Sequence, residues 1–341
     1  MNELKTTERT ITRPAPNLTE LNELIARYAP ILYFDLEEKH KPLSVESYLN
    51  KVSLVNDSEK IKIQANQKNL PVGQKHRGRY YLEFNGTSPS SETTLQTTKV
   101  YVHAKLHSSL YTDLQFWFLF EEDGTVETSI KWIIDTITGH SADPDLGPLG
   151  RQMGCWKRIT IRIDNEKREI KKLFFSQPGN GIWIDSENIE KFNNRINVYL
   201  SKNSHFFYPN EGTHYSEKLS LPVYSSVLEF SFKNTITKGD SFDCSSCYEL
   251  ISADYLGENK PSEPYWLNFC YPWGKEDTSY FNHKSLKEII ANAFGSKLEF
   301  LLSNSVTNEL LGYLQTFFTK QLQNGSNGPK NHDCWGGDEL D

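Results

Sequence analysis

Short segments in which apolar and polar residues alternate follow one another from about residue 29 to residue 275 of this chain. Residues 100–106 alternate Val, Ala or Leu with Tyr, His or Lys, and residues 158–163 alternate Ile with Arg or Thr. A period of two is typical of strands that bury one face. Because no helical patterns are interleaved with these segments, the strands should pair antiparallel, in a sandwich or a barrel. The sequence therefore predicts a mainly β fold, and we favour a jelly-roll-like antiparallel β-sandwich over residues 29–275.

Further strands are expected wherever an apolar run lies between two turn-rich stretches. The run at residues 114–120 is nearly all apolar and aromatic, which predicts a central strand covered on both faces. Aromatic side chains make up 13% of the 341 residues, and rings pack better on a pleated sheet than in a helical bundle. The other expected strands are residues 31–34, 173–175, 182–184, 198–200 and 227–232.

Helical patterns are confined to the two ends of the chain. Apolar residues recur at helical spacing over residues 18–28, so residues 1–28 should be a polar arm and a short helix that Pro30 ends. Two further helical stripes fall within residues 276–324, and we expect these helices to dock on the sheet, although such faces can also bind a membrane surface. Residues 325–341 are acidic and glycine-rich with little to bury, which predicts a loose tail.

Charge and hydropathy argue against two broad classes of protein. No stretch approaches the roughly 20 apolar residues that a transmembrane segment requires. The net charge of −7 argues against nucleic acid as a partner, because binding to a phosphate backbone normally takes a basic surface. The first residues lack the apolar run of a secretory signal. Five cysteines are few for a chain of this length and cannot all pair, which argues against a disulfide scaffold. We therefore expect a cytoplasmic protein, with release from the cell left open.

Several blocks of residues, in a fixed order, resemble a known protein family. They are similar to blocks of the vacuolar protein sorting-associated protein 62 family, most closely of its plant-type branch, and they span roughly residues 29–339. The resemblance implies a link with vacuolar protein traffic and brings no biochemical reaction with it. The blocks are residues 29–34 (APILYF), 42–46 (PLSVE), 99–103 (KVYVH), 112–117 (TDLQFW), 174–177 (FFSQ), 181–184 (GIWI), 248–253 (YELISA), 264–268 (PYWLN), 328–330 (GPK) and 335–339 (WGGDE).

One stretch departs from the pattern of that family in a way that bears on chemistry. The family has His-x-Gly-Asp-Trp-Glu, a set that can hold a metal or perform acid–base chemistry. Here Gly154 and Trp156 are kept, but the three ionisable positions are occupied by Gln152, Cys155 and Lys157. An amide, one thiol and an ammonium make a poor metal site, so we expect no metal at this stretch. The resemblance implies that any activity dependent on the family's cluster is absent or replaced.

Cys155 is the most informative of these substitutions. A thiolate beside an imidazole can act as a nucleophile, and His205 matches a histidine of the family pattern in this region. The neighbouring Lys157 and Arg158 would lower the pKa of the thiol. Cys155 and His205 are therefore the candidate catalytic residues. The alternative is that Cys155 is a small, half-buried residue that fills the space of an unneeded carboxylate.

No other motif predicts a metal or a cofactor. Cys244 and Cys247 have the spacing of half a zinc site, which the tail can complete only if it folds back. His103 and His107 on one strand would lie roughly 13 Å apart, too far to share an ion. Two aspartates of loop 140–145 lack the remaining ligands of a calcium loop. Glycine-rich nucleotide-binding loops and nucleophile elbows are absent from the sequence.

Aromatic side chains are the remaining candidates for a binding site. Rings on loops can line a pocket for a small apolar or carbohydrate ligand, although most rings in a sheet protein belong to its core. The candidate ligand-binding residues are Trp117, Gln152, Trp156, Trp183, Phe206 and Tyr208.

The sequence is compatible with three classes of function. The first is a β-sandwich protein that binds a ligand or partner, which the loss of ionisable positions favours. The second is an enzyme (a cyclase, isomerase or hydrolase) with an aromatic-lined pocket, and the third is a toxin-like protein that binds foreign membranes. Fold alone does not separate them. A closed, ring-lined cavity beside Gly154 would favour the enzyme, and a filled interior with exposed aromatic residues would favour the binding protein.

Overall fold

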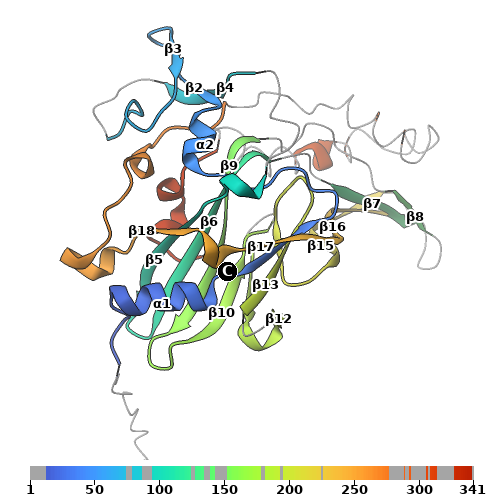
Figure 1. Ribbon diagram of the computed structural model, residues 1–341. Helices are drawn as coiled ribbons and strands as arrows, with labels where there is room; N and C mark the ends of the chain where they lie inside the picture. The colour runs from blue at the N-terminus through green and yellow to red at the C-terminus, as the bar shows by residue number, and fades with distance from the viewer. Residues whose placement is uncertain are drawn as a thin grey trace, which may run out of the picture.

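A six-stranded sheet forms the middle layer of the fold (Figure 1). The computed structural model describes residues 13–73, 79–86, 94–123, 127–133, 139–142, 152–177, 181–192, 195–223, 226–275, 288, 292, 305, 308–312 and 326–339. The strands of the middle sheet lie in the order β11, β10, β9, β6, β5, β18. Their bounds are β5 Val100–Ser108, β6 Tyr111–Asp123, β9 Gln152–Asp164, β10 Glu169–Phe175, β11 Ile182–Asp185 and β18 Tyr248–Ser252.

Strand β6 shows why this sheet is a middle layer. Phe116, Phe118 and Phe120 point into one hydrophobic core, whereas Trp117 and Leu119 point into a second core on the opposite face. Successive side chains of a strand point to opposite faces, so an uninterrupted apolar run is buried on both. The prediction of a central strand covered on both sides is confirmed.

The first core lies between the middle sheet and a second, five-stranded sheet. Helix α1 (Leu18–Tyr28) borders this core with Leu21, Leu24 and Ile25, as its apolar spacing predicts. Asn17 and Glu20 form a reciprocal capping box that fixes the start of the helix. The second sheet consists of β1 Ile31–Asp35, β12 Lys191–Phe192, β13 Arg195–Leu200, β14 Phe207–Tyr208 and β17 Lys238–Asp243.

The second core covers the other face of the middle sheet and is rich in rings. The centroid of Trp156 lies 5.4 Å from that of Trp266 and 5.1 Å from that of Trp273. Such stacked and edge-to-face pairs add to the free energy of area burial. The covering elements are α2 Val45–Leu49, the sheet of β2 Val52–Asn56, β3 Ile61–Gln64 and β4 Tyr80–Phe84, and the 3₁₀ helices η5 Tyr265–Asn268, η6 Pro329–Asn331 and η7 Asp333–Trp335.

Gly154 sits where the backbone of β9 touches this second core. Its φ of +65° lies in the left-handed region that favours glycine. A Cβ at this position would lie 2.4 Å from both the Trp273 carbonyl oxygen and the Tyr48 hydroxyl oxygen, which are themselves joined by a 2.5 Å hydrogen bond. Trp156, two residues on, is only 5% exposed. Gly154 and Trp156 thus shape the start of a strand and fill the core.

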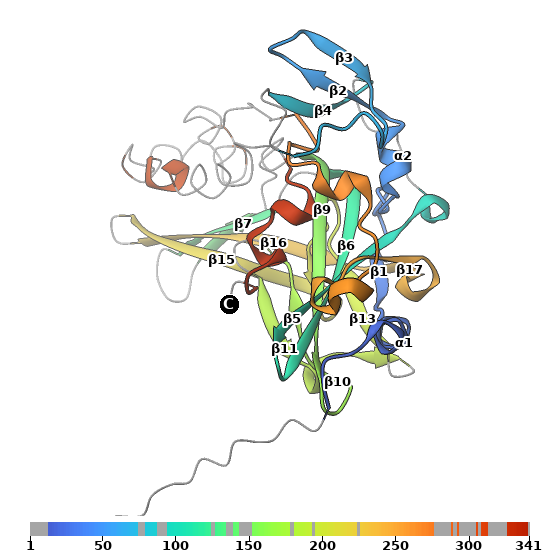
Figure 2. The ribbon, with the colours of Figure 1, turned by 90° about the vertical axis from the view of Figure 1, so that its left-hand side faces the viewer.

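A four-stranded sheet extends sideways from these layers (Figure 2). Its strands lie in the order β15, β16, β7, β8, with bounds β7 Thr128–Ile133, β8 Gly139–Ala142, β15 Gly212–Val223 and β16 Ser226–Ile236. The remaining short helices are η1 Leu95–Thr97, η2 Ser186–Asn188, η3 Cys244–Ser246 and η4 Asp254–Asn259.

Most neighbouring strands pair antiparallel, which confirms the predicted mainly β, antiparallel architecture. Two described pairs are parallel: β1 with β13, and β5 with β18. A parallel pair needs a long crossover, and in both cases more than a hundred residues separate the partners along the chain. The alternation of apolar residues within a strand carries no information about such distant partners.

Residues 326–339 lie against the middle sheet, so the prediction of a loose tail is wrong for this segment (Figure 2). The Glu339 carboxylate accepts hydrogen bonds from the side chains of Gln115 and Arg158. The ring of Trp335 stacks on that of His103 with centroids 3.7 Å apart. The prediction rested on the small number of apolar residues in the tail. It could not include the polar contacts that hold the tail to the sheet.

The predicted helical segment, residues 276–324, is described only in part. Residues 308–312 are helical, with Leu310 and Leu311 buried, and most of this prediction lies outside the described residues, as does the start of the N-terminal arm. Across the described part of the chain, no helix combines the length and the apolar character that crossing a membrane would take.

Candidate functional site

Asp123, the last residue of β6, is the centre of a buried polar cluster between the two larger sheets. Its Oδ2 forms an ion pair with Lys157 Nζ at 2.6 Å and lies 3.6 Å from Cys155 Sγ. Its Oδ1 lies 3.7 Å from His205 Nδ1. The two candidate catalytic residues therefore meet on one carboxylate. We call Glu38, Asp123, Cys155, Lys157 and His205 the Asp123 cluster.

His205 lies in the turn between β13 and β14 and is fully buried. Its ring stacks on Phe120 with centroids 4.0 Å apart, and its Nε2 lies 3.4 Å from Glu38 Oε2. Both ring nitrogens thus face carboxylates at distances longer than a well-formed hydrogen bond. The φ of His205 is +48°, in the left-handed region that few non-glycine residues adopt. The backbone hydrogen bond from the His205 N–H to the Ser201 carbonyl belongs to the same turn.

Glu38 follows β1 and is held by backbone groups. Its Oε1 accepts a hydrogen bond from the His40 N–H at 2.7 Å, and its Oε2 accepts one from the Asn203 N–H at 2.6 Å. Burial alone would raise the pKa of Glu38, but His205 and these two donors outweigh it and lower the pKa to about 2. Glu38 is therefore an anion at neutral pH.

The same contacts fix the charge of His205. Burial would lower the pKa of the imidazole, but the carboxylates of Glu38 and Asp123 outweigh it and raise the pKa to about 9. Lys157 behaves in the same way, because Asp123 more than compensates for its burial and raises its pKa. Two cations thus face two carboxylates, and the cluster is internally neutralised at neutral pH.

Cys155 has the opposite environment from a reactive thiol. It is 4% exposed, and burial, followed by the neighbouring Asp123 carboxylate, raises its pKa well above the ordinary value. Its Sγ lies 3.4 Å from Gln152 Oε1, to which the thiol donates. Cys155 is therefore a neutral hydrogen-bond donor at neutral pH, whereas a catalytic cysteine needs a populated thiolate.

Lys157 brings a cation into the cluster. Its ammonium pairs with Asp123 and lies 4.1 Å from the centroid of Phe206, a cation–π contact. Among the residues that the structure describes, no three His, Cys, Asp or Glu side chains are placed to share a metal ion. Asp143 and Asp145, the two aspartates of loop 140–145, lie outside the described residues.

The candidate ligand-binding rings are packed against protein groups. Trp117, Trp156, Phe206 and Tyr208 are each at most 6% exposed. Trp183 is half-buried, with the cationic ends of Arg162 and Lys172 within 4.4 Å and 4.2 Å of its ring centroid. Neither of the two clefts described below is lined by any of them or by Gln152. Their assignment to a ligand stays a prediction.

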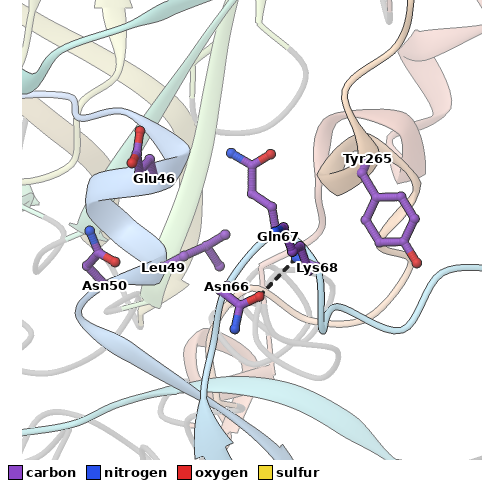
Figure 3. Close-up of a pocket in the computed structure, with 7 residues that line it drawn as sticks. All are labelled: Glu46, Leu49, Asn50, Asn66, Gln67, Lys68 and Tyr265. Atoms are coloured by element: carbon purple, nitrogen blue, oxygen red, sulfur yellow. Dashed lines mark hydrogen bonds between the residues drawn. The ribbon is translucent and has the colours of Figure 1, made fainter.

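Two clefts open on the surface of the described residues. The first, of about 970 Å³, lies between α2, the loop after β3 and the start of η5, and we call it the α2–η5 cleft. Figure 3 shows the helix on one side, the ring of Tyr265 on the other and the loop between them. Its lining consists of Glu46, Leu49, Asn50, Asn66, Gln67, Lys68 and Tyr265.

The three walls of the α2–η5 cleft are held in place by internal contacts. Ser44 caps α2 by accepting a hydrogen bond from the Ser47 N–H. In the loop, the side-chain oxygen of Asn66 accepts a hydrogen bond from the Asn69 N–H at 3.2 Å. The side-chain oxygen of Asn69 accepts one from the Asn66 N–H at 2.9 Å. Trp266, beside Tyr265, is buried in the aromatic core. The walls are therefore pre-organised.

The second cleft, of about 960 Å³, is lined by charged residues of both signs and reaches Glu38. Lys202 in its wall is paired with Glu37 at 2.5 Å, and Lys41 lies 3.9 Å from Asp240. Its charges largely satisfy one another, which leaves fewer groups for a ligand than the first cleft offers.

Glu38 and Asp123 are functional candidates that the sequence did not single out. Asp123 is the last of three acidic residues that follow the apolar run at 114–120, a position that offers a weak signal. Glu38 lies in a polar loop and offers none, because only the fold brings it within reach of His205, 167 positions further along the chain. The lining of the α2–η5 cleft was likewise invisible, since exposed amides are typical of any solvated loop.

Comparison with known proteins places the chain in a family context. The family model described as vacuolar protein sorting-associated protein 62 matches residues 1–339. No curated protein matches the chain. A solved structure, that of Necrosis and Ethylene inducing Protein 2 from the causal agent of cocoa's witches' broom disease, is 13% identical, with 68% of this chain and 74% of that chain covered and a TM-score of 0.27.

Proposed function

The chain belongs to the vacuolar protein sorting-associated protein 62 family, and on that premise we propose that it is a ligand-binding protein whose ligand occupies the α2–η5 cleft. One observation carries the proposal: polar side chains that converge on this cleft are not used by the protein itself. Within the described residues, no hydrogen bond or ion pair holds the side chains of Glu46, Asn50 or Gln67. The same is true of Lys68 and the Tyr265 hydroxyl in the described part of the chain. A rigid recess with unused polar groups is the usual form of a small-molecule site.

The Asp123 cluster supports binding over catalysis. A general base needs a pKa near the working pH and access to a substrate, and His205 has neither, with a pKa of about 9 and no exposed surface. Cys155 is protonated and enclosed. A cluster of this kind fixes the loop of Glu38 and the turn of His205 against the sheet.

Three further observations bear on the compartment and the partners of the protein. All five cysteines, each within the described residues, are free thiols, which supports a reducing cytoplasm. The family's name supports a role connected with vacuolar protein sorting. The net charge of −7 supports a partner other than nucleic acid.

A blocked-cleft experiment tests the proposal. Saturation-transfer NMR would screen the whole chain against a panel of mono- and disaccharides, nucleosides, amino acids, fatty acids and polyols. Asn50→Trp places an indole in the cleft, and Gln96→Trp is the matched control, an exposed amide in the second cleft. We expect at least one compound to bind the wild type and the control but not Asn50→Trp. Binding that survives Asn50→Trp, or no binding by any compound, contradicts the proposal.

A further inference from the structure

The charges on the α2–η5 cleft balance each other. Glu46 contributes one negative charge and Lys68 one positive charge, and the other lining residues are uncharged. A site for phosphate or carboxylate normally gathers several cations, often with a bidentate arginine. The balance here favours an uncharged ligand.

The hydrogen-bonding groups of the cleft suit hydroxyls. Asn50, Asn66 and Gln67 are amides, and an amide offers a donor and an acceptor side by side in one plane. A hydroxyl also both donates and accepts, so adjacent hydroxyls can pair with one amide. The side-chain oxygen of Asn66 already accepts hydrogen bonds from the backbone N–H groups of Lys68 and Asn69. Asn66 can therefore offer a ligand its NH₂ group.

An aromatic ring supplies the apolar part of the site. Tyr265 is 49% exposed, although neighbouring Trp266 is 2% exposed. Figure 3 shows the Tyr265 ring on the wall opposite α2, where Leu49 lies. A ring of this kind packs on the C–H face of a pyranose while its hydroxyl reaches water or the ligand.

The volume and the ordered walls of the α2–η5 cleft suit a ligand of more than one sugar unit. A cleft of about 970 Å³ lies near the upper end of the range of small-molecule sites, about 300–1,000 Å³. Its capped helix and cross-bonded loop are already ordered, so binding costs little additional conformational entropy.

We infer that the ligand of the α2–η5 cleft is an uncharged oligosaccharide of two or three units, held by the amides of Asn50, Asn66 and Gln67 and stacked on Tyr265. The inference rests on the proposed function and adds its ligand class. The chemistry is shared by free oligosaccharides and by glycans attached to a protein, and the experiment separates these two sources.

Isothermal titration calorimetry of the whole chain tests the inference. The probes are neutral di- and trisaccharides of glucose, mannose, galactose and N-acetylglucosamine, a high-mannose glycoprotein, and the same glycoprotein after enzymatic deglycosylation. We expect at least one neutral oligosaccharide to bind. Binding of the glycoprotein that is lost on deglycosylation identifies an attached glycan as the source, and binding of the free sugars alone identifies a free oligosaccharide.

Variants assign the binding to the cleft. Tyr265→Ala should weaken binding about tenfold or more, while Tyr265→Phe, which keeps the ring, should stay within about threefold. Gln67→Ala should weaken it about three- to tenfold. Tyr215→Ala, an exposed tyrosine on β15, is the control and should change nothing.

Three outcomes overturn the inference, and they differ in what they say about the proposed function. If a compound that is not a sugar binds in the cleft and is excluded by Asn50→Trp, the ligand class is wrong but the binding function stands. If no compound of either panel binds, both fail. Sugar binding that Tyr265→Ala and Gln67→Ala leave unchanged also overturns the inference, because the sugar then lies elsewhere.

Discussion

The carboxylate of Glu339 receives two hydrogen bonds from the guanidinium of Arg158, at 2.9 Å from Nε and 2.5 Å from Nη2. The carboxylate is completely covered, and Thr160 and Gln115 donate to its other oxygen. This contact joins the tail to β9 and β6 across the face that carries the aromatic core.

Removing the Glu339 carboxylate should destabilise the protein strongly. Glu339→Ala leaves the guanidinium of Arg158, whose side chain is 14% exposed, without its carboxylate, and breaking a mostly buried ion pair of this kind typically costs about 3–5 kcal/mol. At about 2 °C per kcal/mol for a domain of this size, the melting temperature should fall by about 6–10 °C. Deleting residues 326–341 should cost at least as much.

Asp338→Ala is the control for that measurement. The side chain of Asp338 is 76% exposed, and within the described part of the chain its ion pair is with His107 at 2.9 Å, so its removal should cost at most about 1 kcal/mol. Equal melting temperatures for Glu339→Ala and wild type would show that the tail does not stabilise the fold.

His205 should make the protein less stable as the pH rises. Its pKa is about 9 in the folded protein against 6.5 in the unfolded chain, so the folded state binds the extra proton. This stabilisation is complete below pH 6.5 and is lost as the pH rises through about 9. Between pH 7.5 and 8.5 the contribution of His205 to the free energy of unfolding should fall by about 1.2 kcal/mol, as urea titrations would measure. Thiols that are protonated in the folded state also lower the stability over this range. In His205→Gln the slope should therefore be shallower than in the wild type by the amount that His205 contributes, and equal slopes in the two proteins would contradict the ion contacts of the cluster.

The thiols should react in the order of their exposure. Native protein treated with iodoacetamide at pH 8 should be alkylated first at Cys270, which is exposed, and more slowly at half-buried Cys247. Cys155, Cys244 and Cys334 are buried and should react only after unfolding, as peptide mass spectrometry would show. Early modification of Cys155 would revive the nucleophile hypothesis.

Gly154→Ala should be among the most damaging single substitutions. The added methyl would collide with two groups of the second core, and the left-handed φ would be strained in any case. We expect a loss of about 3 kcal/mol or more, or failure to fold. Gly336→Ala, which meets nothing within 4 Å, should melt within about 2 °C of wild type.

Strands could be predicted from the sequence because a half-buried sheet leaves a local period of two. The alternation at residues 158–163 became β9, and the apolar run at 114–120 became the centre of β6. The parallel partners of β1 and β5 left no such trace, because pairing depends on residues far away in the chain.

The candidate site was predictable only in part, for a related reason. Cys155 and His205 were found by their reactive side chains, but the groups that decide their chemistry, Glu38 and Asp123, are ordinary carboxylates until the fold brings them close. Proximity to Lys157 suggested a lowered thiol pKa. Burial and the Asp123 carboxylate raise the pKa of the thiol instead, and neither effect can be seen from the residues next to Cys155 in the sequence.

The contact between Gln115 and Glu339 spans 224 positions and therefore sets a waiting time during synthesis. At about 5–20 residues per second, about 10–45 s pass between the emergence of the two partners. Throughout that interval the aromatic face of β6, with Trp117, has no tail to cover it. A nascent chain thus exposes this face to wrong associations over that interval, and a premature stop codon that removes Glu339 would remove the contact permanently.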